Sequence, residues 1–261
     1  MVDQSKHAMR SLTAAAKTND VLDRENARSS AKVGAMRCGH QGVSSIVIPP
    51  YTSSIPFTDK QFDFLRNVAR RHAGISIAEF KKSMILRRVR KRLKALSIET
   101  IEDYCKFLAG PNGSREIQPL INVLTTNKTS FFREIHHFQH LQAIGLPEAI
   151  ARKKMMRRGK LRIWSAGCST GEEAWSIAMV VCQSLGLYAD SDVQILATDI
   201  DTEVLNTAER GIYDRSSFKM VPAKLRSEYL EGIPGAQDQF EIARPLRRMV
   251  TFKKLNLHDP W

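Results

Sequence analysis

Two short apolar segments, each followed by a helix-like segment, constrain the fold of this chain more than any other feature. LRIWSAG (161–167) and VQILATDID (193–201) are typical of strands buried on both faces. The segments that follow them, EEAWSIAMVVCQSLG (172–186) and TEVLNTAERG (202–211), are typical of helices. Strands alternating with helices predict a parallel sheet, because a parallel connection needs a crossover helix. The C-terminal part is therefore expected to be an α/β domain.

The sequence before this domain has a helical period instead. In the segment 57–74, Thr58 is placed to cap a helix and Gly74 to end it. Apolar residues recur at helical spacing in the segment that follows, and two further segments before residue 125 have the same character. These patterns predict a small all-helical domain.

The predicted elements divide the chain into four regions. Residues 1–55 are polar and lack a sustained period, which predicts a disordered extension. The helical domain occupies 56–133, a connecting helix or linker occupies 134–158, and the α/β domain occupies 159–261. Within the last region, 211–232 is mixed in character, and 240–257 offers one or two strands of alternating character.

Composition narrows the classes of partner and compartment. The 261 residues carry a formal net charge of +13, which favours nucleic acid, an anionic membrane surface or an acidic protein face as partner. No run of about 18 apolar residues is present, so no membrane span is expected, and the N-terminal segment lacks the apolar core of a secretory signal. Four cysteines without a CxxC pair predict reduced thiols in the cytoplasm and no metal site.

The segment RIWSAGCSTGEEAW (162–175) leads from the first strand into its helix through a tight turn. A phosphate site at a helix start would show a G-x-G-x-x-G or a G-x-x-x-x-G-K-[ST] pattern. Here the glycines are spaced G-x-x-x-G and are followed by Glu172 and Glu173. The spacing and the negative charge disfavour phosphate. They favour a ligand with a positive centre and sugar hydroxyls, such as S-adenosylmethionine.

Two carboxylates near this turn can hold a ligand or cap a helix. Glu173 either completes a capping box with Thr170 or contacts the ligand, and the two roles can coexist. Asp199 ends the second strand, where nucleotide-binding sheets hold ribose hydroxyls, so we expect it to bind the ligand. Asp201 is expected to cap the next helix. Cys168 is expected to be a small packing residue of the turn.

Between the two domains lies TTNKTSFFRE (125–134), which reads as a polar linker with an aromatic anchor or as part of a site. Further upstream, the segment 81–94 has eight basic residues and no acidic one, which favours an electrostatic docking surface over a solvated helix face. It lacks the interleaved aromatic residues of a nucleic-acid module, so no nucleic acid is expected. The eight residues are Lys81, Lys82, Arg87, Arg88, Arg90, Lys91, Arg92 and Lys94.

Four motifs, taken together and in order, resemble those of the CheR-type chemotaxis receptor methyltransferases. They are TTNKTSFFRE, IWSAGCSTGEEAWSIA, ATDIDTEVLNTAERGIY and FKKLNL, within 57–256. The resemblance implies a helical domain followed by a Rossmann-like, class I S-adenosylmethionine-dependent methyltransferase domain with a small β-subdomain. It implies methyl transfer from S-adenosylmethionine to glutamate side chains on the cytoplasmic helices of chemoreceptors, with S-adenosylhomocysteine as product.

The same resemblance implies roles for individual residues. Arg133 is implied to be catalytic by orienting the substrate, the basic segment to be the receptor-docking surface, and 213–252 to be the β-subdomain. The implied cofactor-binding residues are Asn127, Thr129, Arg133, Glu173, Asp199, Asn256 and Leu257.

The sequence supplies three α/β strands before Trp261, fewer than a methyltransferase sheet of this class contains. We therefore expect a partial domain that lacks its C-terminal part. The first strand would then lie at an exposed sheet edge, and the chain would be a monomer or self-associate through that edge. The alternative function is a catalytically incomplete receptor-binding module.

Overall fold

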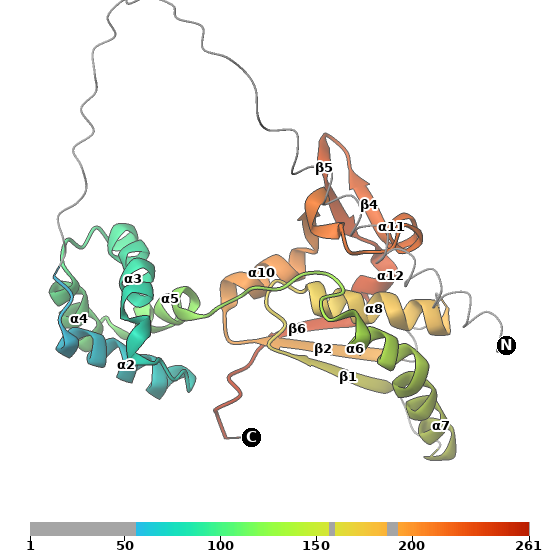
Figure 1. The fold of residues 1–261 in the computed structure, drawn as a ribbon, viewed down its shortest axis with the longest axis horizontal. Coiled ribbons are helices and arrows are strands. Elements are labelled where there is room, and N and C mark those ends of the chain that lie inside the picture. The colour runs from blue at the N-terminus through green and yellow to red at the C-terminus, as the bar shows by residue number, and fades with distance from the viewer. Residues whose placement is uncertain (1–55, 157–159, 187–192, 261) are drawn as a thin grey trace, which may run out of the picture. The chain divides into compact units, whose positions relative to one another are not determined.

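The computed structural model describes residues 56–156, 160–186 and 193–260, and from Pro56 onward the chain clusters into one unit. The predicted extension 1–55 and Trp261 lie outside the described residues. Figure 1 shows the helices of the first part and the small sheets of the second.

Helices form the first part, as predicted. Thr58 begins the first of them with a capping box shared with Gln61, and Gly74 ends it at a φ of 66°. A left-handed φ of this kind costs glycine little, which is why the residue marks the helix end. The helices are α2 (Asp59–Ala73), α3 (Lys82–Leu96, after the 3₁₀ turn η2, Glu79–Lys81), α4 (Ile101–Ala109) and α5 (Ser114–Leu124).

The helical part has its own core and one buried polar cluster. The apolar stripe of α3 supplies Ile85, Val89 and Leu93, all buried. Beside it, the carboxylate of Glu116 accepts hydrogen bonds from Arg92 Nε (2.7 Å) and from the hydroxyl of Tyr104 (2.9 Å). Glu116 is 4% exposed, so this ion pair is part of the core.

Three consecutive helical segments occupy the region in which a connecting helix or linker was expected. They are α6 (Ile135–His140), the π-helical turn η3 (Leu141–Gly145) and α7 (Leu146–Met156). They carry the chain to the first strand of the sheet, which α7 contacts (Figure 1).

The α/β part contains a parallel sheet of three strands in the order β1-β2-β6. Ser165 pairs with Ala197, which pairs in turn with Phe252 of the third strand. Helices follow the first two strands and lie on one side of the sheet (Figure 1), where Trp175 packs edge-on against Phe252. The elements are β1 (Leu161–Ala166), α8 (Glu172–Leu185), β2 (Val193–Asp199), α10 (Thr202–Arg210) and β6 (Val250–Lys254).

The prediction that β1 and β2 are buried on both faces is wrong. Trp164 is 44% exposed and Leu196, its partner in the register, is 40% exposed. Successive strand residues point to opposite faces, and the described helices pack on only one of them. The sheet order also places β1 at an edge of the described sheet, as expected.

A small antiparallel sheet, ordered β3-β5-β4, follows α10 and lies in the segment predicted as the β-subdomain. The predicted limit of 252 is too late, because Val250 to Phe252 belong to β6 of the parallel sheet. The aromatic residues of the subdomain hold the end of the interdomain segment, because Phe131 packs against both Tyr213 and Phe218. The predicted aromatic anchor is thus present. The elements are β3 (Ile212–Asp214), η4 (Arg215–Phe218), α11 (Ala223–Tyr229), β4 (Leu230–Ile233), β5 (Ala236–Ile242) and α12 (Arg244–Arg247).

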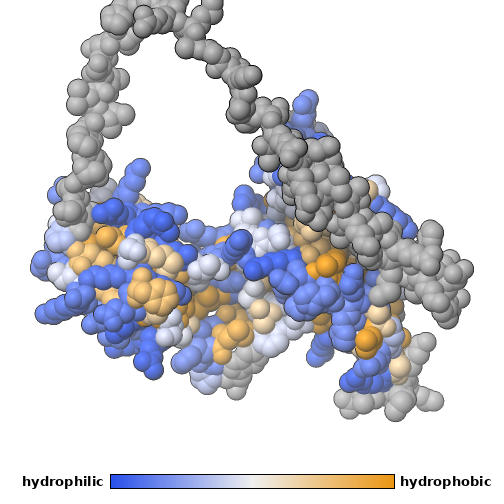
Figure 2. All heavy atoms as spheres, viewed as in Figure 1, coloured by the Kyte–Doolittle hydropathy of each residue, from blue (hydrophilic) through white to orange (hydrophobic). Residues whose placement is uncertain are grey.

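The surface shown in Figure 2 is mainly hydrophilic, with hydrophobic residues gathered in smaller patches. Within the described ranges, no helix has the length and apolar character needed to cross a bilayer.

Candidate functional site

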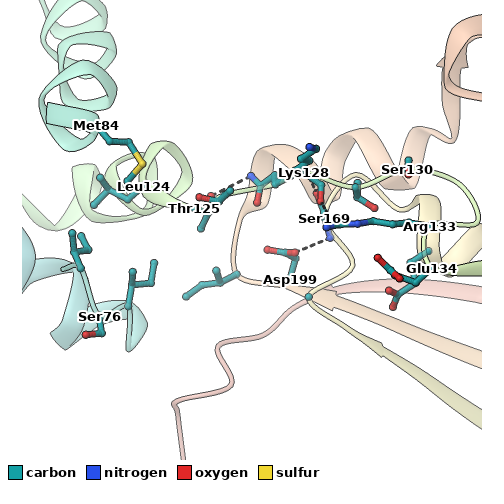
Figure 3. Close-up of a pocket in the computed structure, with 18 of the residues that line it drawn as sticks. Ser76, Met84, Leu124, Thr125, Lys128, Ser130, Arg133, Glu134, Ser169 and Asp199 are labelled. Carbon is teal, nitrogen blue, oxygen red and sulfur yellow. Dashed lines mark hydrogen bonds between the residues drawn. The ribbon is translucent and has the colours of Figure 1, made fainter. Parts of the chain in front are cut away.

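A cavity of about 540 Å³ lies where three loops and the start of the basic helix meet. One loop is the interdomain segment 125–130, one follows β1, and one follows β2. Its volume is within the range of small-molecule sites. Figure 3 shows Asp199 at the strand end and Lys128 and Ser130 on the loop that crosses it. The cavity therefore gathers the segments that the sequence singled out.

The two glycines of the turn after β1 have different structural roles. Gly167 has a φ of 77°, and a Cβ built on it would meet nothing within 4 Å. Gly171 has a φ of 96°, and a Cβ there would come within 2.8 Å of Ala208 Cβ. Both conformations favour glycine, but only Gly167 leaves open space at the cavity. A ligand can approach the backbone at Gly167, while Gly171 lets the turn pack closely.

Asp199 is fixed at the end of β2 by two backbone donors. The amide of Ser169 donates to its Oδ2 at 2.8 Å, and the amide of Asp201 donates to its Oδ1 at 2.9 Å. The side chain is 9% exposed and lines the cavity. Each carboxylate oxygen can accept a further hydrogen bond, so Asp199 can still receive ligand hydroxyls.

The capping-box interpretation of Glu173 is wrong. The helix begins one residue later than that reading required, with Gly171 at the N-cap position and no side-chain cap. Thr170 donates instead to Glu172, and Glu173 accepts a hydrogen bond from Ser165 Oγ at 2.7 Å. Glu173 lines the cavity, so its carboxylate is free of the helix end and placed for a ligand.

The interdomain segment contributes Asn127, Thr129 and Arg133 to the cavity wall. Arg133 Nη1 donates to the carbonyl of Lys128 at 2.7 Å, which closes the segment into a turn (Figure 3). The amide group of Asn127 donates to Asp201 at 2.6 Å. These contacts hold the loop at two points, and its polar residues line a common cavity.

Asn256 and Leu257 lie in a second cavity of about 350 Å³, which shares Gly167 and Asp199 with the first. Asn256 Oδ1 accepts the backbone amide of His258 at 3.1 Å, so the residue orders its own turn. Leu257 is 55% exposed. All seven residues expected at the cofactor site thus line one of two adjoining cavities.

The basic segment is not uniform. Arg88 donates to the carbonyls of Leu124 (2.6 Å) and Thr125 (2.5 Å), and Arg92 pairs with the buried Glu116. This corrects the prediction that places these two arginines on the docking surface, because their guanidinium groups serve internal contacts. Lys82 is half-buried and pairs with Asp59. The exposed members are Lys81, Arg87, Arg90, Lys91 and Lys94.

Burial, and after it the charge of Asp199, raises the pKa of the Cys168 thiol to about 12. A thiol with this pKa is neutral near pH 7 and is a poor nucleophile. The prediction that Cys168 is a packing residue is confirmed by its 1% exposure.

Sequence reasoning missed the residues of the helical part that line the cavity. Ile75, Ile77 and Met84 carry no polar group and lie in no recognisable motif. It also missed the contacts of Asp201 with the interdomain segment, because the cap alone explained that residue. A sequence pattern does not indicate contacts between residues about seventy positions apart, such as the hydrogen bond from Asn127 to Asp201.

A carboxylate at the end of a parallel strand, beside an open glycine turn, is typical of α/β proteins that bind nucleoside-containing ligands. Two family models match the chain: "CheR methyltransferase, all-alpha domain" over residues 60–125 and "CheR methyltransferase, SAM binding domain" over residues 127–261. The chain belongs to the CheR methyltransferase family.

Curated relatives match most of this chain. A "Probable chemotaxis protein methyltransferase" of Rhizobium etli is 37% identical over 72% of this chain and 70% of its own length. "Chemotaxis protein methyltransferase 2" of Pseudomonas aeruginosa is 37% identical over 77% and 69%. The "Chemotaxis protein methyltransferase" of Salmonella typhimurium is 35% identical over 83% and 72%.

Proposed function

We propose that this chain transfers a methyl group from S-adenosylmethionine to glutamate side chains on the cytoplasmic helices of chemoreceptors. The observation that carries the proposal is the convergence of Asp199, Glu173 and Arg133 on one cavity, in a chain of this family. The proposal places the reaction in the cytoplasm, where these receptor helices lie.

The charges of the cavity suit this cofactor. S-adenosylmethionine supplies a methyl group on a cationic sulfur and carries a ribose and an amino acid, with no phosphate. Asp199 would accept the ribose hydroxyls, and Glu173 would face the positive charge of the amino-acid portion. Asn256 and Leu257, in the adjoining cavity, would surround the adenine. The open space at Gly167 leaves room between these groups.

The reaction needs little acid–base catalysis from the protein. A glutamate side chain has an unperturbed pKa of about 4.3, so it is already an anion near neutral pH and needs no general base. The residues must align this carboxylate with the methyl group and exclude water. Arg133 can do the first, because its cationic guanidinium lies at the cavity and can attract a carboxylate. The buried Phe131 and Phe132 hold the loop that carries it.

The exposed basic face of α3 would dock the substrate. Arg87, Arg90, Lys91 and Lys94 recur at spacings of three and four, so they lie on one face of the helix. Receptor helices that carry several glutamates are complementary in charge to this face.

Calorimetric titration with S-adenosylhomocysteine tests the cofactor site. We expect wild type to bind and Asp199→Asn to bind at least about tenfold more weakly, since a hydrogen bond to a charged group contributes about 1.5–3 kcal/mol. Glu173→Gln should weaken binding in the same direction. Glu203→Gln, an exposed carboxylate on α10, is the matched control and should bind as wild type does.

Transfer itself is tested with methyl-labelled S-adenosylmethionine and a receptor cytoplasmic fragment. We expect label on the fragment, and none when its modifiable glutamates are replaced by alanine. Binding of both ligands without transfer would instead support the receptor-binding module. Failure of folded wild type to bind S-adenosylhomocysteine would overturn the enzymatic proposal.

A further inference from the structure

We propose that Asp201 is a positioning residue for methyl transfer: through Asn127 it holds the loop 125–130 as a wall of the cofactor cavity. The proposal rests on the proposed function for its effect on the cofactor. Its structural half, the anchoring of the loop, can be tested without any ligand.

The two carboxylate oxygens of Asp201 serve different elements. Oδ1 accepts the backbone amides of Glu203 (2.9 Å) and Val204 (3.3 Å), which caps α10. Oδ2 accepts the side-chain amide of Asn127 (2.6 Å) and the hydroxyl of Thr125 (2.7 Å). Capping requires only the first oxygen, so the second is available to the loop.

This carboxylate lies where few competing contacts are possible. Asp201 is 2% exposed, so water does not replace its partners if they move. Hydrogen bonds to an ionised acceptor are shorter and stronger than those between neutral groups, which fits the 2.6 Å distance to Asn127. Replacing the Asp201 carboxylate, which accepts the hydrogen bond from Asn127, would therefore release the loop at this one contact.

The loop has a direct route from this anchor to the cofactor residues. The backbone carbonyl of Asn127 accepts a hydrogen bond from Ser169 Oγ (3.1 Å), and the amide of Ser169 donates to Asp199. The amide of Asp201 also donates to Asp199. Asp201, Asn127, Ser169 and Asp199 thus form a closed ring of contacts that joins all three loops of the cavity.

The variant Asp201→Asn removes the contact that anchors the loop and keeps the contact that caps α10. Asparagine caps helices about as well as aspartate, and the two side chains have nearly the same shape. Its amide nitrogen would face the amide nitrogen of Asn127, so a donor would meet a donor. Turning the Asn127 amide to present its oxygen would break the 3.1 Å hydrogen bond from its Nδ2 to Thr125 Oγ1. Thr125 can adapt, because its hydroxyl can accept from the new amide while donating to the carbonyl of Asn122, 2.8 Å away.

Asn127→Asp combined with Asp201→Asn restores a donor and an acceptor with their places exchanged. Asn127→Asp alone would set two carboxylates against each other at this distance. The double variant should therefore behave better than either single variant, which a merely additive loss of stability cannot produce.

Hydrogen exchange of the unliganded protein is the first measurement. We expect amides of 125–130 to exchange at least fivefold faster in Asp201→Asn than in wild type, with α10 unchanged, and the double variant to recover most of the protection. Equal exchange in wild type and Asp201→Asn would overturn the proposal, whether or not the protein binds the cofactor.

Titration with S-adenosylhomocysteine is the second measurement. We expect Asp201→Asn to bind at least tenfold more weakly at nearly unchanged thermal midpoint, and the double variant to bind at least fivefold more tightly than Asn127→Asp. The control is Thr58→Ala, which removes the cap of α2 and should lower the midpoint without changing affinity. If the affinity for S-adenosylhomocysteine fell together with the thermal midpoint in all variants, Asp201 would contribute to stability alone, and its positioning role would be contradicted. Absence of binding by wild type would count against the proposed function alone.

Discussion

At the scale of single residues, Cys168 connects the chemistry of the cavity to the stability of the fold. Its thiol is buried, and its pKa is raised from about 9 to about 12, first by burial and then by the charge of Asp199. The unfolded chain therefore loses this proton at a lower pH than the folded chain. The stabilisation is complete below about pH 9 and is lost as the pH rises toward 12.

We expect Cys168→Ala to reduce the alkaline loss of stability. Urea unfolding of wild type should show a free energy of unfolding that falls between pH 8.5 and pH 10.5, and the alanine variant should fall less steeply, because it has no thiol to deprotonate. The difference between the two slopes is the measurement, so the effects of other groups cancel. Parallel slopes would contradict the pKa assigned to this thiol.

Single residues also show where sequence reasoning reaches its limit. The family resemblance of the four motifs was sufficient to predict seven residues that line the two cavities. The role of Glu173 was not predictable, because a shift of one residue in the helix start decides between a capping role and contact with the ligand. The double role of Asp201 was not predictable either, since its second oxygen contacts a segment that is distant in sequence.

At the scale of elements, Arg88 and Arg87 differ although they are adjacent and chemically identical. Arg88 Nη1 donates to the carbonyls that end α5, and Nη2 donates to Thr126 Oγ1 at 3.1 Å, at the start of the cavity loop. Arg87 is exposed on the proposed docking face. Substituting the two arginines one at a time therefore distinguishes support of the C-terminal end of α5, by Arg88, from docking of the substrate, by Arg87.

We expect Arg88→Ala to lower the free energy of unfolding by about 2 kcal/mol, since it removes charged hydrogen bonds to otherwise unpaired carbonyls. Arg87→Ala should stay within about 0.5 kcal/mol of wild type and should weaken binding of a receptor fragment. Urea unfolding and calorimetry with the fragment measure the two effects. Equal loss of stability in both variants would contradict this division.

The buried cluster of α3, α4 and α5 makes a second prediction at this scale. Glu116 raises the pKa of Arg92, chiefly through their hydrogen bond, and burial together with Glu116 raises that of Tyr104. Glu116→Ala leaves the half-buried Arg92 without its partner, and loss of one member of a buried pair costs about 3–5 kcal/mol. We expect a loss near the lower limit, because Arg92 is partly exposed.

Urea unfolding of Glu116→Ala measures this cost. The control is Glu102→Ala, which removes an exposed partner of Lys106 and should leave the unfolding midpoint unchanged. A Glu116→Ala midpoint equal to that of the control would show that the cluster contributes nothing to stability.

Elements were easier to predict than their surroundings. Caps such as Thr58 and Gly74 and the order of strands and helices follow from local chemistry. Burial of Trp164 and Leu196 does not, because it depends on what packs against the second face of the sheet. Likewise, the half-buried state of Arg88 depends on the position of α5, which no local pattern in α3 reports.

At the scale of the whole molecule, the helical part and the sheet part are joined by side chains of α5. Gln118 Nε2 donates to the carbonyl of Ile200 at 2.9 Å, and Asn122 Nδ2 donates to the hydroxyl of Thr202 at 2.9 Å. The first cavity is lined from both parts, by Ile77 and Met84 as well as by Asp199. A ligand in this cavity would therefore contact both parts at once and stabilise their contact.

We expect S-adenosylhomocysteine to slow hydrogen exchange in 75–85 of the helical part as well as in the loops of the sheet part. The amides of α4 line neither cavity and are the internal control. Asn122→Ala should reduce the protection of 75–85 more than that of the turn after β1, because it loosens the joint and leaves Asp199 in place. Protection confined to residues 127–260 would contradict a shared cavity. In that case, the helical part would serve docking alone, and the cofactor would be bound by the sheet part without its help.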